Sequence, residues 1–482
     1  MITPVTKRSA ITLLASVLTV SAHPAVAQVS ESQIDAIFTS LKSTNAPGAA
    51  VLVVRNGRTV FRRGYGVTDL RSRRKIDEHT NFRLASFTKQ FTAACIMLLV
   101  RDGKLHYDDH LTDLLPEFPA YGKAITVRNL LNHTSGLPDY EDILMKQYPD
   151  TPEEKIPQIL DAGVLKLLEQ QTTGKFPAGA KWEYSNSGYA VLAMIVEKVS
   201  GKPFGQFLHE RVFTLLRMTN TLAYERGKNE VRDRAYGHIR KGDGWQETDQ
   251  SPTSAVLGDG GIYSSLDDLA KWDRAISDHT LLTAAEMQPA LTPVRPTDGP
   301  AKSPEGKVVS YGFGWFLDPR QGHKRMFHDG ETIGFRTTIQ RFPDDQLTII
   351  VMANRADVDP EQLALKVADL YLKSSVSKIG TGRANLGRGR RGNGGCCACR
   401  AGIAFVHQVL QFLARLEERD FLRWHFHALA GLGIAADARF ALAGAEAAKA
   451  ANLDFVAGAQ GAHHAVKDSL HNYFAVFAGK FR

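Results

Sequence analysis

Cysteine is scarce in this chain of 482 residues, which contains only four. Cys95 stands alone in the first 395 residues, and the other three lie between Cys396 and Cys399. This pattern excludes a disulfide scaffold, so the main body must be stabilised by a packed hydrophobic core. Cys396 and Cys399 have no second C-x-x-C pair, and His463 and His464 lack partner spacing, so we expect no metal site.

Net charge is also lacking over most of the chain. The formal charge of +8 comes from the two ends, since residues 1–27 carry +2 and residues 376–482 carry +7, which leaves −1 for residues 28–375. A body so close to neutral gives no reason to expect a nucleic-acid or membrane partner. Gly387 to Gly392 satisfies G-x-G-x-x-G but follows no strand and opens no clear helix, so we expect no dinucleotide site there.

No apolar run near the N-terminus is long enough to span a bilayer, which takes about 20 residues. Lys7 and Arg8 precede a mostly apolar stretch at residues 9–22, and Ala25-Val26-Ala27 follows before Gln28. This order is typical of a signal peptide over residues 1–27, although a buried N-terminal helix is the alternative. We expect export to the periplasm or the medium, with no membrane anchor after cleavage.

The composition changes after about Ser375. Residues 376–482 contain no proline and open with a segment rich in glycine and arginine at 380–395. An Ala-rich helical domain, a disordered tail and an out-of-frame or fused C-terminus all fit this composition. We favour the last, because a strong helix predicted over residues 360–372 already completes a domain that runs from 28 to 375.

Strand patterns occur at both ends of that domain. Residues 49–54 and 58–62 flank Asn56-Gly57, which supplies the positive φ angles of a type I′ hairpin turn. Near the other end, strands are predicted at 311–317, 325–327, 335–342 and 347–354.

Between these strands the patterns are mostly helical. The helix over residues 87–100 is apolar all round and should be central and buried. Further helices are predicted at 125–132, 187–200 and 265–276, the last with a capping box formed by Ser265 and Asp268. The fold class is therefore α+β, with one antiparallel sheet built from both ends of the domain and a mainly helical insertion.

The strongest local motif is S-x-x-K at Ser86 and Lys89, at the start of the buried helix. Helical spacing puts the hydroxyl and the amine on one face, where a desolvated lysine can lose its proton and activate the serine. The helix N-terminus would also favour an oxyanion. Alone the motif is weak, because Ser86 could simply cap the helix, and Ser375 and Lys378 form a chance match.

Three short motifs follow one another along the chain, namely Ser86 to Lys89, Tyr184-Ser185-Asn186 and His328-Asp329-Gly330. Their order and spacing resemble those of the serine hydrolases of the class C β-lactamase family. This family also includes D-alanyl-D-alanine carboxypeptidases, D-aminopeptidases and esterases. The resemblance covers roughly residues 30–375, and flanking segments at 125–138, 176–179 and 260–264 extend it.

The resemblance implies a β-lactamase/transpeptidase-like fold and a role for each matching residue. Ser86 would be the acyl-forming nucleophile, Lys89 its general base, and Tyr184 the group that relays protons to and from the leaving group. Asn186 would hold Lys89 and the carbonyl side of the substrate. The backbone N–H groups of Ser86 and Glu331 would form the oxyanion hole.

Taken without the resemblance, these residues have ordinary explanations. Tyr184 could be a core aromatic, Asn186 could cap the helix that follows it, and His328 could be a satisfied strand histidine. Gly330 fits a strand that lies flat against a bound substrate.

His328 departs from the many family β-lactamases that have lysine at this position. Histidine is mostly neutral above its reference pKa of about 6.5, so it offers no fixed cation to the carboxylate of a drug. Glu331 further disfavours an anionic substrate. Both residues favour a peptidase or an esterase over an efficient β-lactamase.

We therefore expect an exported serine hydrolase that uses no cofactor and acts on a small-molecule or peptide substrate. D-amino-acid peptides, small esters and β-lactams are the candidates. One alternative is a penicillin-binding D,D-peptidase trapped by β-lactams, and another is a non-catalytic cell-wall or ligand-binding module on the same fold. The sequence does not determine the oligomeric state.

Overall fold

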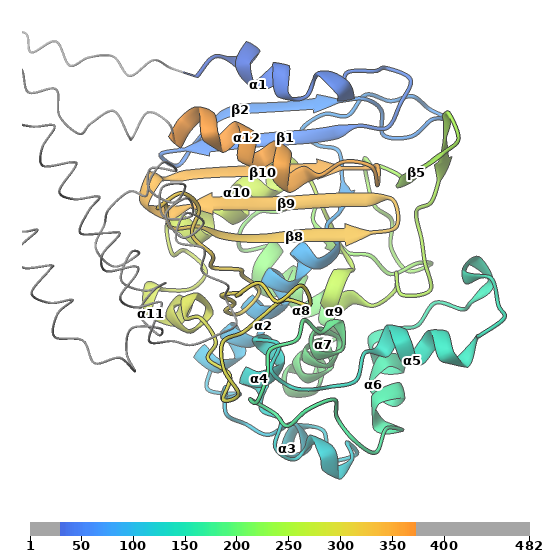
Figure 1. The fold of residues 1–482 in the computed structure, drawn as a ribbon, viewed down its shortest axis with the longest axis vertical. Helices are drawn as coiled ribbons and strands as arrows, with labels where there is room; N and C mark the ends of the chain where they lie inside the picture. The colour runs from blue at the N-terminus through green and yellow to red at the C-terminus, as the bar shows by residue number, and fades with distance from the viewer. Residues whose placement is uncertain (1–28, 373–482) are drawn as a thin grey trace, which may run out of the picture. The chain divides into compact units, whose positions relative to one another are not determined.

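The computed structural model describes residues 29–372. The predicted signal peptide and the predicted tail lie outside the described residues. The main sheet is antiparallel, with five strands in the order β2-β1-β10-β9-β8 (Figure 1). Both ends of the domain thus contribute to one sheet, as predicted. Its strands are β1 (Ala49–Arg55), β2 (Arg58–Tyr65), β8 (Met326–Thr332), β9 (Phe335–Phe342) and β10 (Leu347–Ala353).

The hairpin that joins β1 and β2 has the predicted turn. Asn56 and Gly57 have φ angles of 51° and 70°, which is the positive φ pair that a type I′ turn requires. β1 then pairs with β10 along its whole length, from Ala49 opposite Ala353 to Arg55 opposite Leu347. The centre of the sheet therefore joins the first and last strands of the described chain.

The two faces of the sheet pack against different layers, because successive side chains of a strand point to opposite faces. Val51 and Val53 of β1 lie in a hydrophobic cluster with helices α1 (Glu31–Ile37) and α12 (Pro360–Leu372). Figure 1 shows α12 lying across the sheet on this face. Leu52 belongs instead to the large core on the opposite face, which includes α2 (Lys89–Arg101).

Helix α2 is central and buried, as its apolar sequence predicts, since every residue from Lys89 to Leu99 is buried. A three-stranded sheet, β3-β7-β4, and a two-stranded hairpin, β5-β6, accompany the helices. These short strands are β3 (Phe82–Arg83), β4 (Leu222–Ala223), β5 (His238–Lys241), β6 (Gly244–Glu247) and β7 (Ile262–Ser264). The other helices are α3 (Leu111–Leu114), α4 (Val127–Leu131), α5 (Tyr140–Gln147), α6 (Asp161–Glu169), α7 (Asn186–Ser200), α8 (Phe204–Leu208), α9 (Leu257–Gly260), α10 (Leu266–Ser277) and α11 (Ala284–Met287).

Two predicted elements differ from the structure. The strand expected at residues 311–317 is wrong, because Tyr311 and Phe316 form only isolated bridges and their rings pack instead in an aromatic cluster with Trp182. The strand expected at residues 325–327 is longer, and β8 carries the whole His328-Asp329-Gly330 motif.

The capping box predicted at α10 is only half present. Ser265 accepts a hydrogen bond from the Asp268 N–H, but the Asp268 carboxylate accepts from the Asn220 N–H and the Thr221 hydroxyl instead.

A buried ion pair ties α10 to the sheet. Arg341 Nε of β9 donates to Asp273 Oδ1 at 2.7 Å, and the Thr348 hydroxyl of β10 donates to the same oxygen at 2.7 Å. Both charged side chains are buried, so each depends on the other for compensation of its charge.

Over residues 29–372, no helix has the length and hydrophobicity needed to cross a membrane.

Candidate functional site

A sharp turn presents Ser86 at the point where β3 gives way to α2. Ala85 has a φ of 50°, an uncommon conformation for a residue with a side chain, and Ser86 follows it within a short 3-10 turn. Such strain is often found at functional sites, where the surrounding structure must hold it in place.

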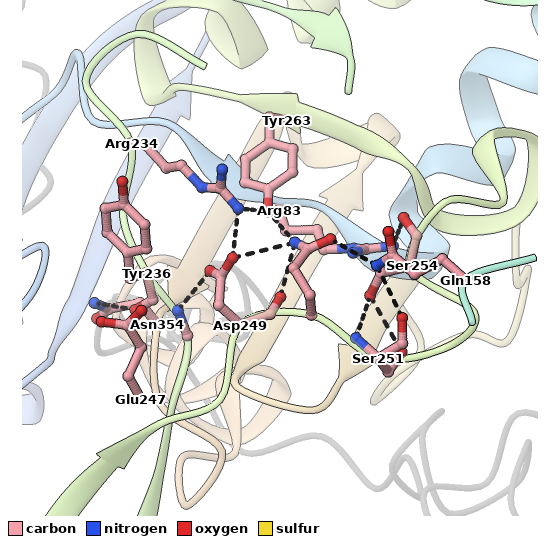
Figure 2. A network of polar contacts seen from close by, with 12 residues as sticks. Arg83, Gln158, Arg234, Tyr236, Glu247, Asp249, Ser251, Ser254, Tyr263 and Asn354 are labelled. Atoms are coloured by element: carbon pink, nitrogen blue, oxygen red, sulfur yellow. Dashed lines mark hydrogen bonds and ion pairs between the residues drawn. The ribbon is translucent and has the colours of Figure 1, made fainter. Parts of the chain in front are cut away.

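Arg83 anchors the strand that leads into this turn. Its guanidinium donates to the Ser254 carbonyl at 2.9 Å (Figure 2). It also donates to the Gly260 carbonyl at 3.2 Å. In the same network Arg234 pairs with Asp249 and lies over three tyrosine rings. These contacts hold the segment before Ser86 firmly against α9 and β7.

Lys89 is fully buried and makes three hydrogen bonds. Its Nζ lies 3.0 Å from Ser86 Oγ, 2.8 Å from Asn186 Oδ1 and 3.0 Å from the backbone oxygen of Asp259. Burial lowers the pKa of Lys89 to about 8, although the negative charge of Asp259 opposes this shift. Lys89 thus directly contacts both Ser86 and Asn186, two of the other predicted site residues.

Acidic side chains lie beside this group. Asn186 Nδ2 donates to Glu141 Oε1 at 3.1 Å, and the Tyr140 hydroxyl donates to Asp259 Oδ2 at 2.9 Å. Burial raises the pKa of Glu141 to about 7, and the charge of Asp259 adds to the effect. Tyr140, Glu141 and Asp259 are not among the site residues predicted from the sequence. The one signal was position, since Tyr140 and Glu141 follow closely on the flanking segment 125–138.

The Tyr184-Ser185-Asn186 motif leads into helix α7, whose first residue is Asn186. Ser185, not Asn186, caps the helix, because its side chain accepts from the Gly188 N–H. This leaves the Asn186 amide free to join Lys89 to Glu141. The alternative explanation of Asn186 as a helix cap is therefore wrong.

Tyr184 lies next to both the lysine and the serine. The Lys89 Nζ is 4.9 Å from the centre of the tyrosine ring. Burial raises the pKa of the Tyr184 phenol well above its ordinary value, and a hydrogen-bonding interaction with Ser86 opposes this shift. Tyr184 thus neighbours both Ser86 and Lys89.

His328 is buried, and both of its ring nitrogens have partners. Nδ1 lies 2.7 Å from the Asp329 carbonyl, which can only accept, so Nδ1 carries the proton. Nε2 then accepts from the Tyr311 hydroxyl at 3.1 Å. Burial lowers the pKa of His328 to about 3, and nearby Lys89 adds to the effect. His328 is thus neutral, and it packs near the Tyr184 ring with 6.2 Å between the ring centres.

Gly330 lies where β8 approaches the Ser86 turn. A Cβ atom at Gly330 would lie 2.0 Å from the Leu84 carbonyl oxygen and 2.3 Å from Thr337 Oγ1. A glycine is therefore needed here so that β8 can approach the backbone at Leu84. The sequence suggested only that Gly330 keeps the strand flat against a bound substrate. Glu331 comes next in β8, and its exposed carboxylate pairs with Arg336 at 2.8 Å.

Metal-ligating side chains do not gather in the described part of the chain. Residues 29–372 contain no group of three or more histidine, cysteine or acidic side chains that could hold a metal ion.

Comparison with known proteins gives matches over most of the described residues. The model of the Beta-lactamase family matches residues 34–372. Penicillin-binding protein 4* of Bacillus subtilis (strain 168) is 31% identical over 355 residues, which cover 70% of this chain and 75% of that protein. D-aminopeptidase of Brucella anthropi is 28% identical over 69% of this chain and 61% of its own length.

One of the similar solved structures is a D-amino acid amidase from Ochrobactrum anthropi SV3 complexed with L-phenylalanine amide. It matches with a TM-score of 0.60 and 24% identity, over 72% of this chain and 98% of that chain. At this level of identity the likeness shows the fold alone, and it confirms the predicted α+β architecture.

Proposed function

Because this chain belongs to the Beta-lactamase family and is a serine hydrolase of that family, we propose that it acylates on Ser86 and then releases the acyl group to water. The catalytic domain spans residues 28–375, and the protein is exported. The observation that carries the proposal is the set of three contacts made by Lys89.

Those contacts fix the direction of the lysine lone pair. The Asn186 side-chain oxygen and the Asp259 backbone oxygen can only accept hydrogen bonds, so a neutral Lys89 must donate its two N–H groups to them. The lone pair then faces Ser86 Oγ, the third neighbour. A neutral Lys89 in this position can take the proton of Ser86 as the oxygen attacks a carbonyl carbon.

The remaining steps use Tyr184 and two backbone groups. As the tetrahedral intermediate collapses, Tyr184 passes a proton to the leaving nitrogen or oxygen, and Lys89 resupplies it. The backbone N–H groups of Ser86 and Glu331 stabilise the oxyanion, because Gly330 brings β8 against the segment before Ser86. Water then attacks the acyl-enzyme by the reverse sequence of proton transfers.

Charge in the site favours a substrate without a carboxylate next to the reacting bond. His328 is neutral, and Arg336 is already paired with Glu331. Glu141 has one oxygen on Asn186 and adds a partly buried acid to the site. Amides and peptides of D-amino acids with a free ammonium group, and small esters, fit this charge better than β-lactams do. The names of the D-aminopeptidase and D-amino acid amidase relatives agree with this choice.

Intact mass measured over time tests the proposal. The protein is mixed separately with benzylpenicillin, D-alanine amide and p-nitrophenyl butyrate, and product release is followed in parallel. Ser86→Ala should lose both the adduct and the turnover, whereas Ser375→Ala, at the chance S-x-x-K match, should keep them. Turnover by Ser86→Ala would overturn the mechanism.

The lifetime of the adduct separates the alternatives. A penicilloyl adduct that persists for hours would identify a penicillin-binding peptidase trapped by β-lactams, and rapid loss with product would identify a β-lactamase. An adduct from neither the drug nor the ester, together with no release of ammonia from the amide, would favour the non-catalytic binding module.

A further inference from the structure

His133 holds an unusual position just after α4. It is buried, and its φ of 62° places a residue with a large side chain in the left-handed region. A buried side chain in a strained backbone persists only where surrounding contacts fix it. Those contacts run to the segment that carries Tyr184.

Two hydrogen bonds from that segment end on His133, one on each side of Tyr184. The Glu183 N–H donates to the His133 carbonyl at 2.9 Å, and the Ser185 N–H donates to His133 Nδ1 at 3.1 Å. The imidazole also lies against the tyrosine ring, with 4.4 Å between the ring centres and 37° between the planes. The backbone on both sides of Tyr184 and its ring are therefore held by one residue.

The hydrogen bond from Ser185 also fixes the tautomer of His133. Since the Ser185 N–H donates, Nδ1 carries no proton and the neutral ring is protonated at Nε2. Nε2 is buried without a hydrogen-bond partner among the described residues. The ring is instead surrounded by the aromatic rings of Trp182, Tyr189 and Tyr311, at centre distances of 6.0, 5.2 and 4.6 Å.

We infer that His133 is a positioning residue for proton transfer, which holds the Tyr184 phenol in line with Ser86 and the leaving group through the acceptor at Nδ1 and the stacked ring. The inference rests on the proposed role of Tyr184. His133 does not touch the reacting atoms, so its loss should weaken proton delivery to the leaving group and leave the Ser86–Lys89 pair in place.

Two esters of one acid separate this role from a purely structural one. Methoxide needs a proton in order to leave, whereas p-nitrophenolate leaves without one. His133→Phe keeps a ring but removes the acceptor. It should lower kcat/KM for methyl butyrate about 100-fold, and for p-nitrophenyl butyrate no more than about threefold, because general acid catalysis is worth about 10²- to 10⁴-fold.

Asparagine provides the rescue. His133→Asn tolerates a positive φ and offers a side-chain oxygen to the Ser185 N–H, so it should recover methyl ester hydrolysis to within about tenfold of the unsubstituted protein. If His133→Phe does not accumulate as folded protein, His133→Met, which also lacks the acceptor, takes its place.

His238 supplies a matched control. It is buried in β5, and its Nδ1 lies 3.3 Å from the Asn354 carbonyl. Within residues 29–372, its Nε2 also has no hydrogen-bond partner. His238→Phe should change the rates with both esters by the same factor.

Tyr184→Phe distinguishes the two ways in which the inference can fail. If Tyr184→Phe slows the methyl ester selectively and His133→Phe slows both esters equally, His133 is only structural and the inference is overturned. If Tyr184→Phe itself shows no selectivity, the proposed role of Tyr184 fails first.

Discussion

Lowering the pH should remove activity by protonating Lys89. With a pKa of about 8, only about a tenth of Lys89 is neutral at pH 7 and about half at pH 8. The value of kcat/KM for p-nitrophenyl butyrate should therefore rise about tenfold per pH unit below pH 8 and level off above it. Lys89→Arg should be inactive at every pH, because a guanidinium keeps its proton.

The same shift in pKa makes a prediction about stability. The folded-state pKa of Lys89 lies below the ordinary value of 10.5, so the unfolded chain binds more protons between about pH 8 and pH 10.5. The contribution of Lys89 to the free energy of unfolding should rise by about 3 kcal/mol across that window.

Urea unfolding at pH 7.5 and pH 10.5 measures this contribution as the difference between the unsubstituted protein and Lys89→Met. Lys175→Met, at an exposed lysine, is the control and should show no such change. The assignment of Lys89 as a desolvated base would be refuted by a pH profile of kcat/KM with its midpoint near pH 10. A stability difference between the unsubstituted protein and Lys89→Met that does not change with pH would also refute it.

Three other substitutions test neighbouring features. Glu141→Gln removes a negative charge that raises the pKa of Lys89, so the activity limb should move to lower pH in the same ester assay. Gly330→Ala places a Cβ 2.0 Å from the Leu84 oxygen, and should cost about 1–3 kcal/mol in urea unfolding together with a loss of kcat. Asp273→Asn leaves the buried arginine of β9 without its charge partner, and should cost about 3–5 kcal/mol with little change in KM.

Features that depend on nearby residues were predictable from the sequence. Asn56-Gly57 specifies its turn by local backbone preference, and α12 begins at Pro360, where the sequence predicts that the helix begins. Residues 311–317 were wrongly predicted as a strand, because strand propensity mainly reflects how side chains fit a half-buried surface. In the structure, the rings of Tyr311 and Phe316 find such a surface in an aromatic cluster outside a sheet.

The site residues also divide into those whose contacts follow from local spacing and those that only the fold brings together. Ser86 and Lys89 have the i, i+3 spacing that places two side chains on one face of a helix, so their contact follows from local geometry. Glu141 and Asp259 reach the site from distant parts of the chain, and neither belongs to a motif that marks it as a neighbour of Lys89. His133 lies inside the flanking segment 125–138, but its function as an acceptor for Ser185 depends on a left-handed backbone that only the structure reveals.

The pairing of β1 with β10 sets the order of events during synthesis of the chain. The Gly48 N–H donates to Asn354 Oδ1 across 306 positions of sequence, and neighbouring bonds in the sheet span nearly as many. A ribosome must therefore make almost the whole domain before the middle of its main sheet can close. Until then the β1–β2 hairpin exposes an unpaired edge, and closing so long a loop makes folding slow.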